Sequence, residues 1–143
     1  MLKKVILLCF SILMSVALIT NCGKDDEDSA TPTGPTTQEL SLATEIQPIF
    51  TASCATSMCH KGAGASAGLN LEQGQAHANL VGVPSQQDAS KQRVKAGDAA
   101  NSYLIIKIEG RQTVGNRMPP SRALSSDQIA AIKKWIDQGA KNN

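Results

Sequence analysis

The chain has 143 residues, of which 18% are charged and only 3% are aromatic. This length favours one domain and argues against a multi-domain enzyme, a polytopic membrane protein or a repeat solenoid. The formal net charge is +2 and there is no basic run. This excludes an obvious nucleic-acid binder, because phosphate recognition needs Lys and Arg clustered on one face.

Residues 1–21 have the pattern of an export signal. Lys3 and Lys4 stand before an uncharged apolar run over residues 5–19. That run is shorter than the ~20 residues that a helix needs to cross a bilayer. A short apolar run behind a positively charged start predicts a signal peptide, which is not part of the folded protein.

The end of this leader, Leu-Ile-Thr-Asn-Cys-Gly over 18–23, resembles a bacterial lipobox, with Asn21 in place of the usual small residue. The resemblance implies that Cys22 becomes the acylated first residue of an exported lipoprotein, anchored by its lipid on the periplasmic side of a membrane. Gly23 is not the Asp of inner-membrane retention, which favours the outer membrane. Ordinary cleavage and an uncleaved anchor are the alternatives.

Residues 22–39 are predicted to be a flexible acidic tether, and residues 40–143 the folded domain. The tether contains five acidic side chains and one basic one, and its Ser, Thr, Gly and Pro content cannot build a core. Lys3 and Lys4 belong to the leader and Lys24 to the tether. Of the chain's 14 basic and 12 acidic side chains, residues 40–143 therefore keep 11 and 7, a net charge of +4.

A helix is predicted over about residues 43–57, with Pro48 near its first turn, where a missing N–H costs least. It runs into Cys54-Ala-Thr-Ser-Met-Cys59-His60. A cysteine followed directly by histidine, with a second cysteine upstream, resembles c-type haem attachment, although four residues separate the cysteines here and two are usual. In that chemistry the thiols add to the haem vinyl groups and the adjacent His binds the iron. A longer loop can bulge outward while both thiols still reach.

Two other interpretations of this motif stay open. In an exported chain a lone cysteine pair forms a disulfide by default. It would close a short loop in a haem-free interaction module and leave His60 on the surface. A zinc site would be short of ligands, since only Cys54, Cys59, His60 and His77 are available beyond carboxylates.

The middle of the chain predicts a Gly-rich loop and two helices. Residues 61–68 are too rich in Gly for regular structure, and a short helix spans about residues 72–81. Asp98 is the expected N-cap of a helix through Glu109 that ends at Gly110. The run over residues 104–108 alone would suit a strand equally well.

The last part of the chain predicts a loop and a terminal helix. Met118 stands before two prolines in a Gly/Pro-punctuated loop over residues 115–120. Ser125 is the expected N-cap of the helix, Gln128 closes a capping box, and Leu124 staples to the fifth residue after it. An apolar stripe continues to a stop at Gly139: Ile129, Ile132, Trp135 and Ile136.

The order of attachment motif, middle helices, Met-Pro loop and terminal helix resembles small class I cytochromes c. Six segments resemble the planctomycete-type cytochrome c domain over roughly residues 40–143: 46–50, 68–71, 94–98, 102–104, 117–120 and 132–136. The resemblance implies an all-α bundle of about four helices around one covalent haem c. It favours a helix over residues 104–108. It also implies that the last helix crosses the first, packing Ile132, Trp135 and Ile136 on Ile49 and Phe50.

The same resemblance implies the roles of the site residues. Cys54 and Cys59 would hold the haem covalently, His60 would be the proximal iron ligand and Met118 the distal one, with His77 as the rival distal ligand. Methionine ligation favours reduced iron and raises the potential relative to bis-His ligation. The expected function is that of a lipid-anchored, one-electron carrier. A haem peroxidase is the enzymatic alternative, and it would need an open iron position and a distal acid–base residue.

A redox protein with an acidic docking patch is the expected partner. Lys61 follows the proximal ligand, Arg117 precedes the distal one and Arg122 lies close behind. Sequence order thus predicts a basic rim around the haem edge. Residues 40–143 contain only three aromatic residues, Phe50, Tyr103 and Trp135. Since domains of this size bury little apolar surface, the haem is expected to complete the core, and the apoprotein to be poorly folded.

Overall fold

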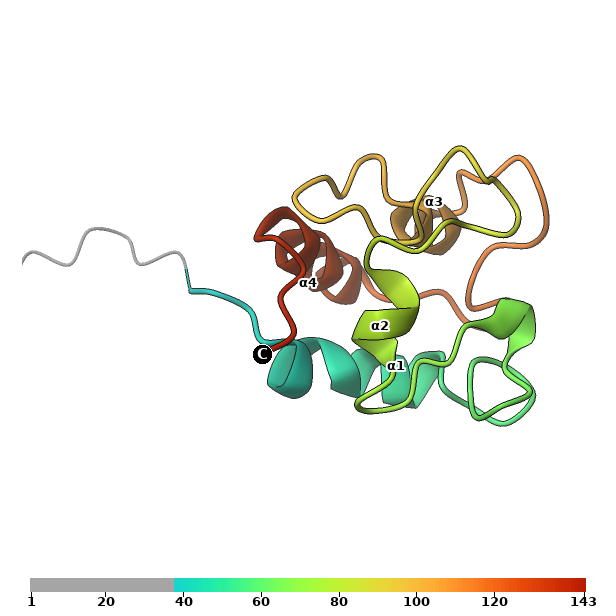
Figure 1. The fold of residues 1–143 in the computed structure, drawn as a ribbon, viewed down its shortest axis with the longest axis horizontal. Helices are drawn as coiled ribbons and strands as arrows, with labels where there is room; N and C mark the ends of the chain where they lie inside the picture. Colours follow the sequence, from blue (N-terminus) through green and yellow to red (C-terminus); the bar gives the residue numbers. More distant parts are fainter. Residues whose placement is uncertain (1–37) are drawn as a thin grey trace, which may run out of the picture. The chain divides into compact units, whose positions relative to one another are not determined.

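The computed structural model of the chain describes residues 38–143, which contain four α-helices and no β-strand (Figure 1). The predicted all-α fold class is confirmed. Two isolated β-bridges, Val81 with Val94 and Pro84 with Gln92, join the segments on either side of a loop. The predicted signal peptide, the predicted acylation site Cys22 and the tether up to residue 37 lie outside the described residues.

The first helical segment is shorter than the sequence predicts. A π-helical turn over Leu42–Ile46 runs into α1 (Gln47–Ser53), with Pro48 in the first turn of α1 as expected. The helix was predicted to continue to about residue 57. It stops because the backbone of Cys54 turns away (φ −126°), and its N–H and that of Ala55 both bond the Phe50 carbonyl, at 2.8 and 2.7 Å.

The two middle helices are also shorter than predicted. α2 covers Ala76–Leu80 instead of 72–81, and α3 covers Tyr103–Glu109. Asp98 is not the N-cap of α3, so that prediction is wrong. Its carboxylate accepts the Asn101 N–H at 3.1 Å and closes a separate turn. The helix that was predicted for residues 104–108 is present, and it ends at Gly110 in the left-handed conformation (φ 75°).

The terminal helix α4 (Ser126–Asp137) begins as the sequence predicts. The Ser125 hydroxyl accepts the Gln128 N–H at 3.2 Å, and the Gln128 side chain accepts the Ser125 N–H at 3.0 Å, which completes the capping box. Leu124 is buried, and Ile129 packs partly buried against the same core. Both ends of the staple therefore lie in the core.

The core sits where α4 packs on the first helical segment. The rings of Phe50 and Trp135, both fully buried, meet edge to face with centroids 6.5 Å apart and planes at 80°. This confirms the predicted packing of Trp135 on Phe50. The C-terminus returns to the start of the first helical segment (Figure 1), where the Ala43 N–H donates to the Asn143 carbonyl at 2.9 Å. The ring contact holds α1 at Phe50, four residues before Cys54, where the cysteine motif begins.

Across residues 38–143, none of the helices has both the length and the apolar character needed to cross a membrane.

Candidate haem-binding site

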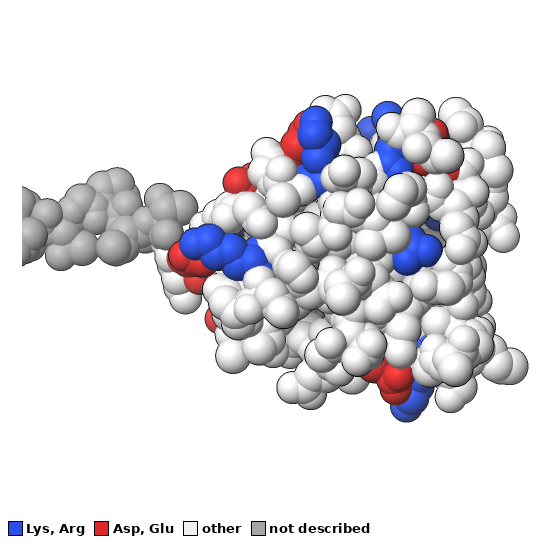
Figure 2. All heavy atoms as spheres, in the orientation of Figure 1, with Lys and Arg blue, Asp and Glu red and all other residues white. Residues whose placement is uncertain are grey.

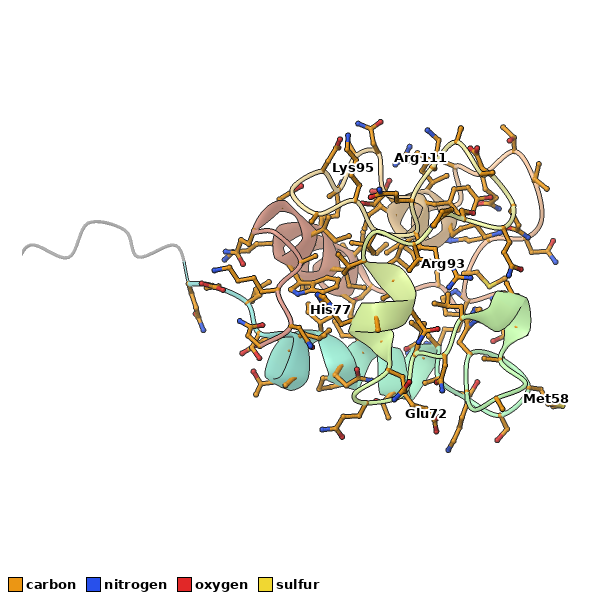
Figure 3. The ribbon with its side chains drawn as sticks, in the orientation of Figure 1. Met58, Glu72, His77, Arg93, Lys95 and Arg111 are labelled. Atoms are coloured by element: carbon orange, nitrogen blue, oxygen red, sulfur yellow. The ribbon has the colours of Figure 1, made fainter. Side chains whose placement is uncertain are left out.

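The cysteine motif forms a closed loop at the end of α1. Cys54 is the C-cap residue of the helix, and its carbonyl accepts the His60 N–H at 3.1 Å, which brings the two ends of the motif together. Thr56 and Ser57 are exposed, and Met58 is 97% exposed and points away from the fold in Figure 3. The outward bulge that the longer spacing predicts is therefore present.

The two thiols differ in their surroundings. Cys54 is buried and Cys59 is half-buried, and both are free thiols in this structure. Burial, and secondarily the neighbouring Cys59, raises the pKa of Cys54 to about 11. The buried sulfur is thus neutral at physiological pH. A thioether sulfur is also neutral, so it suits the same surroundings. Among residues 38–143, no three His, Cys, Asp or Glu side chains gather as a metal-binding group.

The ring of His60 is oriented by a backbone carbonyl. Its Nδ1 lies 3.2 Å from the Leu69 carbonyl oxygen. Since a carbonyl only accepts, Nδ1–H donates, and Nε2 is the unprotonated nitrogen of the neutral ring. Burial lowers the pKa of His60, and the positive charge of Arg93 acts in the same direction. A neutral imidazole with a fixed Nδ1–H and a free Nε2 is the form that binds a metal.

The loop that carries Met118 is fastened to the end of α3. The Met118 N–H donates to the Lys107 carbonyl at 3.0 Å, and Arg117 Nε–H donates to the Ile108 carbonyl at 3.1 Å. The last carbonyls of a helix have no partner within it, so the loop supplies the missing donors. Met118 is half-buried. Its backbone position therefore does not depend on its side chain.

Two adjoining cavities, of about 300 and 200 Å³, bring the predicted residues together. Cys54, His60 and Met118 line both of them, and Cys59 lines the smaller one. Leucine and isoleucine side chains make up much of the wall of the larger one: Leu69, Leu71, Leu80, Leu104 and Ile108. An apolar space with two thiols, a neutral imidazole and a thioether on its wall fits the donor set and the apolar ring of haem c.

Two buried cations that sequence reasoning did not select also line the larger cavity. Arg93 is 9% exposed and Lys107 is 7% exposed. Lys107 Nζ donates to the Gln87 side-chain oxygen at 2.9 Å, and the Tyr103 hydroxyl donates to the same oxygen at 3.3 Å. The signal available in the sequence was a lone Lys within the apolar run over residues 104–108.

His77 and the predicted rim residues lie apart from these cavities. His77, on α2, lines neither of them, and its Nε2 lies 2.9 Å from the Ala140 carbonyl oxygen. Lys61 faces Glu72 at 3.9 Å. Arg117 and Arg122 are exposed, and Arg122 lines a groove of about 550 Å³ that also contacts Cys59. The face in Figure 2 is largely uncharged, with acidic and basic side chains side by side near its edges and one group of basic atoms alone right of centre.

Residues 43–140 match the family model for cytochrome c. Among solved structures, the chain is similar to the hydrazine synthase of Kuenenia stuttgartiensis, at 24% sequence identity and a TM-score of 0.48. That similarity covers 71% of this chain and 16% of the other chain, so this chain spans only a small part of that protein's length. No curated protein matches the sequence.

Proposed function

We propose a function in electron transfer for this chain, which belongs to the cytochrome c family and therefore carries covalently bound haem c. The protein acts as an exported monohaem carrier that accepts and passes on one electron, rather than as an enzyme. When bound, the haem supplies the Fe(III)/Fe(II) couple. The observation that carries the proposal is that two thiols, a neutral histidine and a methionine converge on two adjoining apolar cavities.

In this proposal the attachment loop holds the haem and binds its iron on one side. Cys54 and Cys59 would hold the haem through thioether bonds from their sulfur atoms. His60 would bind the iron through Nε2, because its Nδ1–H donates to the Leu69 carbonyl and fixes the ring plane. The outward bulge of residues 56–58 takes up the two extra residues of the motif.

Met118 is the proposed sixth ligand. It shares the wall of both cavities with His60, whereas His77 lines neither and is bonded to the C-terminal segment. A neutral thioether favours the reduced iron and raises the potential. With Met118 as a ligand, the iron would have no open position for peroxide, as expected of a carrier rather than a peroxidase.

The covalent attachment is tested by mass spectrometry of the mature protein and by haem staining after denaturing electrophoresis. Wild type is expected to keep haem under denaturing conditions. Cys54→Ala and Cys59→Ala are expected to keep one thioether or none and to be unstable, while Ser57→Ala, an exposed change in the same loop, matches wild type. A double cysteine variant as protease-resistant as wild type would contradict the haem-dependent fold.

The sixth ligand is tested by the sulfur-to-iron charge-transfer band of the oxidised protein. Met118→Ala is expected to lose the band, lower the potential and open the iron to small ligands. Met58→Leu is the matched control, because Met58 is almost fully exposed, and it should keep the band. Loss of the native ligation in His77→Ala, with Met118→Ala unchanged, would reassign the ligand.

The lipid at Cys22 is the proposed membrane anchor, with the outer membrane favoured because Gly23 follows it. One acyl chain binds a membrane only marginally, so stable anchoring needs the several chains of a lipoprotein. The mass spectrum that tests the haem also reports these chains.

A redox protein with an acidic patch is the proposed partner. Arg117 and Arg122 are exposed, and the groove beside Arg122 reaches Cys59. Lys61 contributes less, because Glu72 lies beside it. Charge steering acts over ~10 Å at 0.1 M salt, so electron exchange with an acidic partner should slow as salt rises. Arg122→Glu should flatten that slope and Lys134→Glu, on α4, should not. If the electron-exchange rate of wild type does not change with salt concentration, the basic rim has no role in docking.

A further inference from the structure

Two positive charges line the larger cavity, and no acidic residue within the described part of the chain balances them. Arg93 and Lys107 are both almost fully buried. The ion pairs among residues 38–143 involve Lys61, Lys95, Arg111, Lys133 and Lys141, and neither Arg93 nor Lys107 is among them. In the view of Figure 3 Arg93 falls over the middle of the domain, whereas Lys95 and Arg111 are seen at its edge. A buried charge without a counter-charge is unfavourable, so these two positions call for an anion.

The hydrogen bonds of the two cations are to neutral groups. The Arg93 guanidinium donates to the carbonyls of Ala67 at 2.7 Å and Asn79 at 2.8 Å. Lys107 donates to the Gln87 amide oxygen, one of three bonds that an ammonium group can make. Burial is the one cause that lowers the pKa of each cation, with no opposing contribution from an acid. Both groups therefore retain unused donors and uncompensated charge.

The buried positive charges are unequally distributed between the two cavities. Of the Lys and Arg residues that the structure describes, none lines the smaller cavity, where Cys59 lies, and both buried cations line the larger one. Haem has the same polarity, because its vinyl groups and its two carboxylates lie at different edges of the ring. Thioether bonds at the cysteines would place the vinyl edge toward the smaller cavity and the carboxylate edge toward the larger one.

We propose that Arg93 and Lys107 bind the two haem carboxylates as an ion-paired group, with the Tyr103 hydroxyl as an additional donor. This assignment rests on the proposed function, because it needs the haem to be attached at the cysteines. A carboxylate oxygen has the acceptor chemistry of the Gln87 oxygen, which already receives bonds from both Lys107 and Tyr103. The pairing keeps both carboxylates ionised next to the haem.

The other titratable groups around the larger cavity are few. Cys54, His60 and Tyr103 line it with the two cations, and none of the Asp or Glu residues between positions 38 and 143 does. Asp88 is the acid whose charge reaches Tyr103 and helps to raise its pKa, after burial. With Cys54 and His60 committed to the haem and the pKa of Tyr103 raised by burial, the carboxylates and their cations are the groups within the cavity that can change the reduction potential between about pH 5 and pH 8.

The test measures the midpoint potential of the holoprotein from about pH 5 to pH 8. Wild type and Lys134→Met, which removes an exposed charge on α4, should have the same shallow profile. Lys107→Met should raise the pKa of a haem carboxylate. The midpoint potential of this variant should therefore be lower than that of wild type at pH 8 and should rise more steeply as the pH falls. Lys107→Arg should restore the shallow profile. A Lys107→Met profile identical to that of Lys134→Met would overturn the assignment.

A second measurement needs no variant, in case Lys107→Met does not accumulate as holoprotein. Infrared difference spectra between the oxidised and reduced forms, with the haem carboxylates isotopically labelled, should show ionised carboxylates in wild type at pH 5. Protonated carboxyl bands at that pH would overturn the pairing. Wild-type protein without covalent haem would instead contradict the proposed function, so the two failures are distinguishable.

Discussion

Replacing Trp135 tests whether the packing of α4 on α1 holds the haem site together. Trp135 is fully buried, meets Phe50 edge to face at 6.5 Å, and donates its indole N–H to the Lys141 carbonyl at 3.0 Å. Trp135→Ala leaves a large cavity, which costs about 3–5 kcal/mol. The whole free energy of unfolding of such a domain is about 5–15 kcal/mol. The substitution is therefore expected to remove about a fifth or more of the stability.

Smaller substitutions separate the ring contact from the cavity. A double-mutant cycle with Phe50→Leu and Trp135→Leu should give a coupling of about 0.5–1.5 kcal/mol, the contribution of an aromatic pair beyond its buried area. Urea unfolding of the oxidised holoprotein would be followed by circular dichroism and by the charge-transfer band. Val114→Ala, at a position that is 54% exposed, should stay within about 0.5 kcal/mol of wild type.

Two results would contradict this reasoning. A loss below about 1 kcal/mol in Trp135→Ala would show that the site does not depend on this packing, since cavity formation alone predicts more. A coupling indistinguishable from zero would show that the edge-to-face geometry contributes nothing. Loss of the charge-transfer band well before the helices unfold would locate the weak point in the Met118 loop instead.

Three further predictions concern other parts of the chain. The hydrogen bonds from Lys95 and Asn101 lower the pKa of Asp98 from 3.8 to about 2. Its stabilising contribution is therefore complete above about pH 4 and lost as the pH falls toward 2. Asp98→Asn should flatten the dependence of the urea midpoint on pH in that window, and an unchanged dependence would contradict it. Gly110→Ala places a side chain at φ 75° and should lower stability by about 1–2 kcal/mol. A melting temperature equal to that of wild type would refute this. Cys22→Ser should release the protein from membranes into the soluble exported fraction, whereas continued sedimentation with membranes would identify the leader as the anchor.

Local signals in the sequence were sufficient to predict the helix ends whose geometry depends only on neighbouring residues. The capping box of Ser125 and Gln128 and the left-handed Gly110 each involve atoms within a few positions of one another. Their chemistry is the same in any fold, so pattern reasoning found them. The cysteine motif was equally local, and the structure places its thiols and His60 on the cavities that Met118 also lines.

The elements that were missed depend on contacts between distant segments. α1 was expected to continue past Cys54, but the His60 N–H bonds the Cys54 carbonyl and closes the attachment loop there. Asp98 is of a residue type that favours N-caps, yet it closes a turn. Ser102 is the N-cap of α3. The burial of Arg93 follows from carbonyls of segments 14 and 26 residues away. No window of sequence contains that information.

Three of the four helices are too short to be stable without an apolar group that packs between them. α1 has seven residues, α2 five and α3 seven, and isolated helices below ~12–15 residues are marginal in water. The walls of the two cavities come from the ends of α1 and α2, from α3 and from the loops that connect these helices. A rigid apolar ring bonded to the attachment loop and to Met118 would join those loops to α1 and α3. Ligation and folding should therefore be one cooperative process, with the haem site and the helices unfolding together in the wild-type holoprotein.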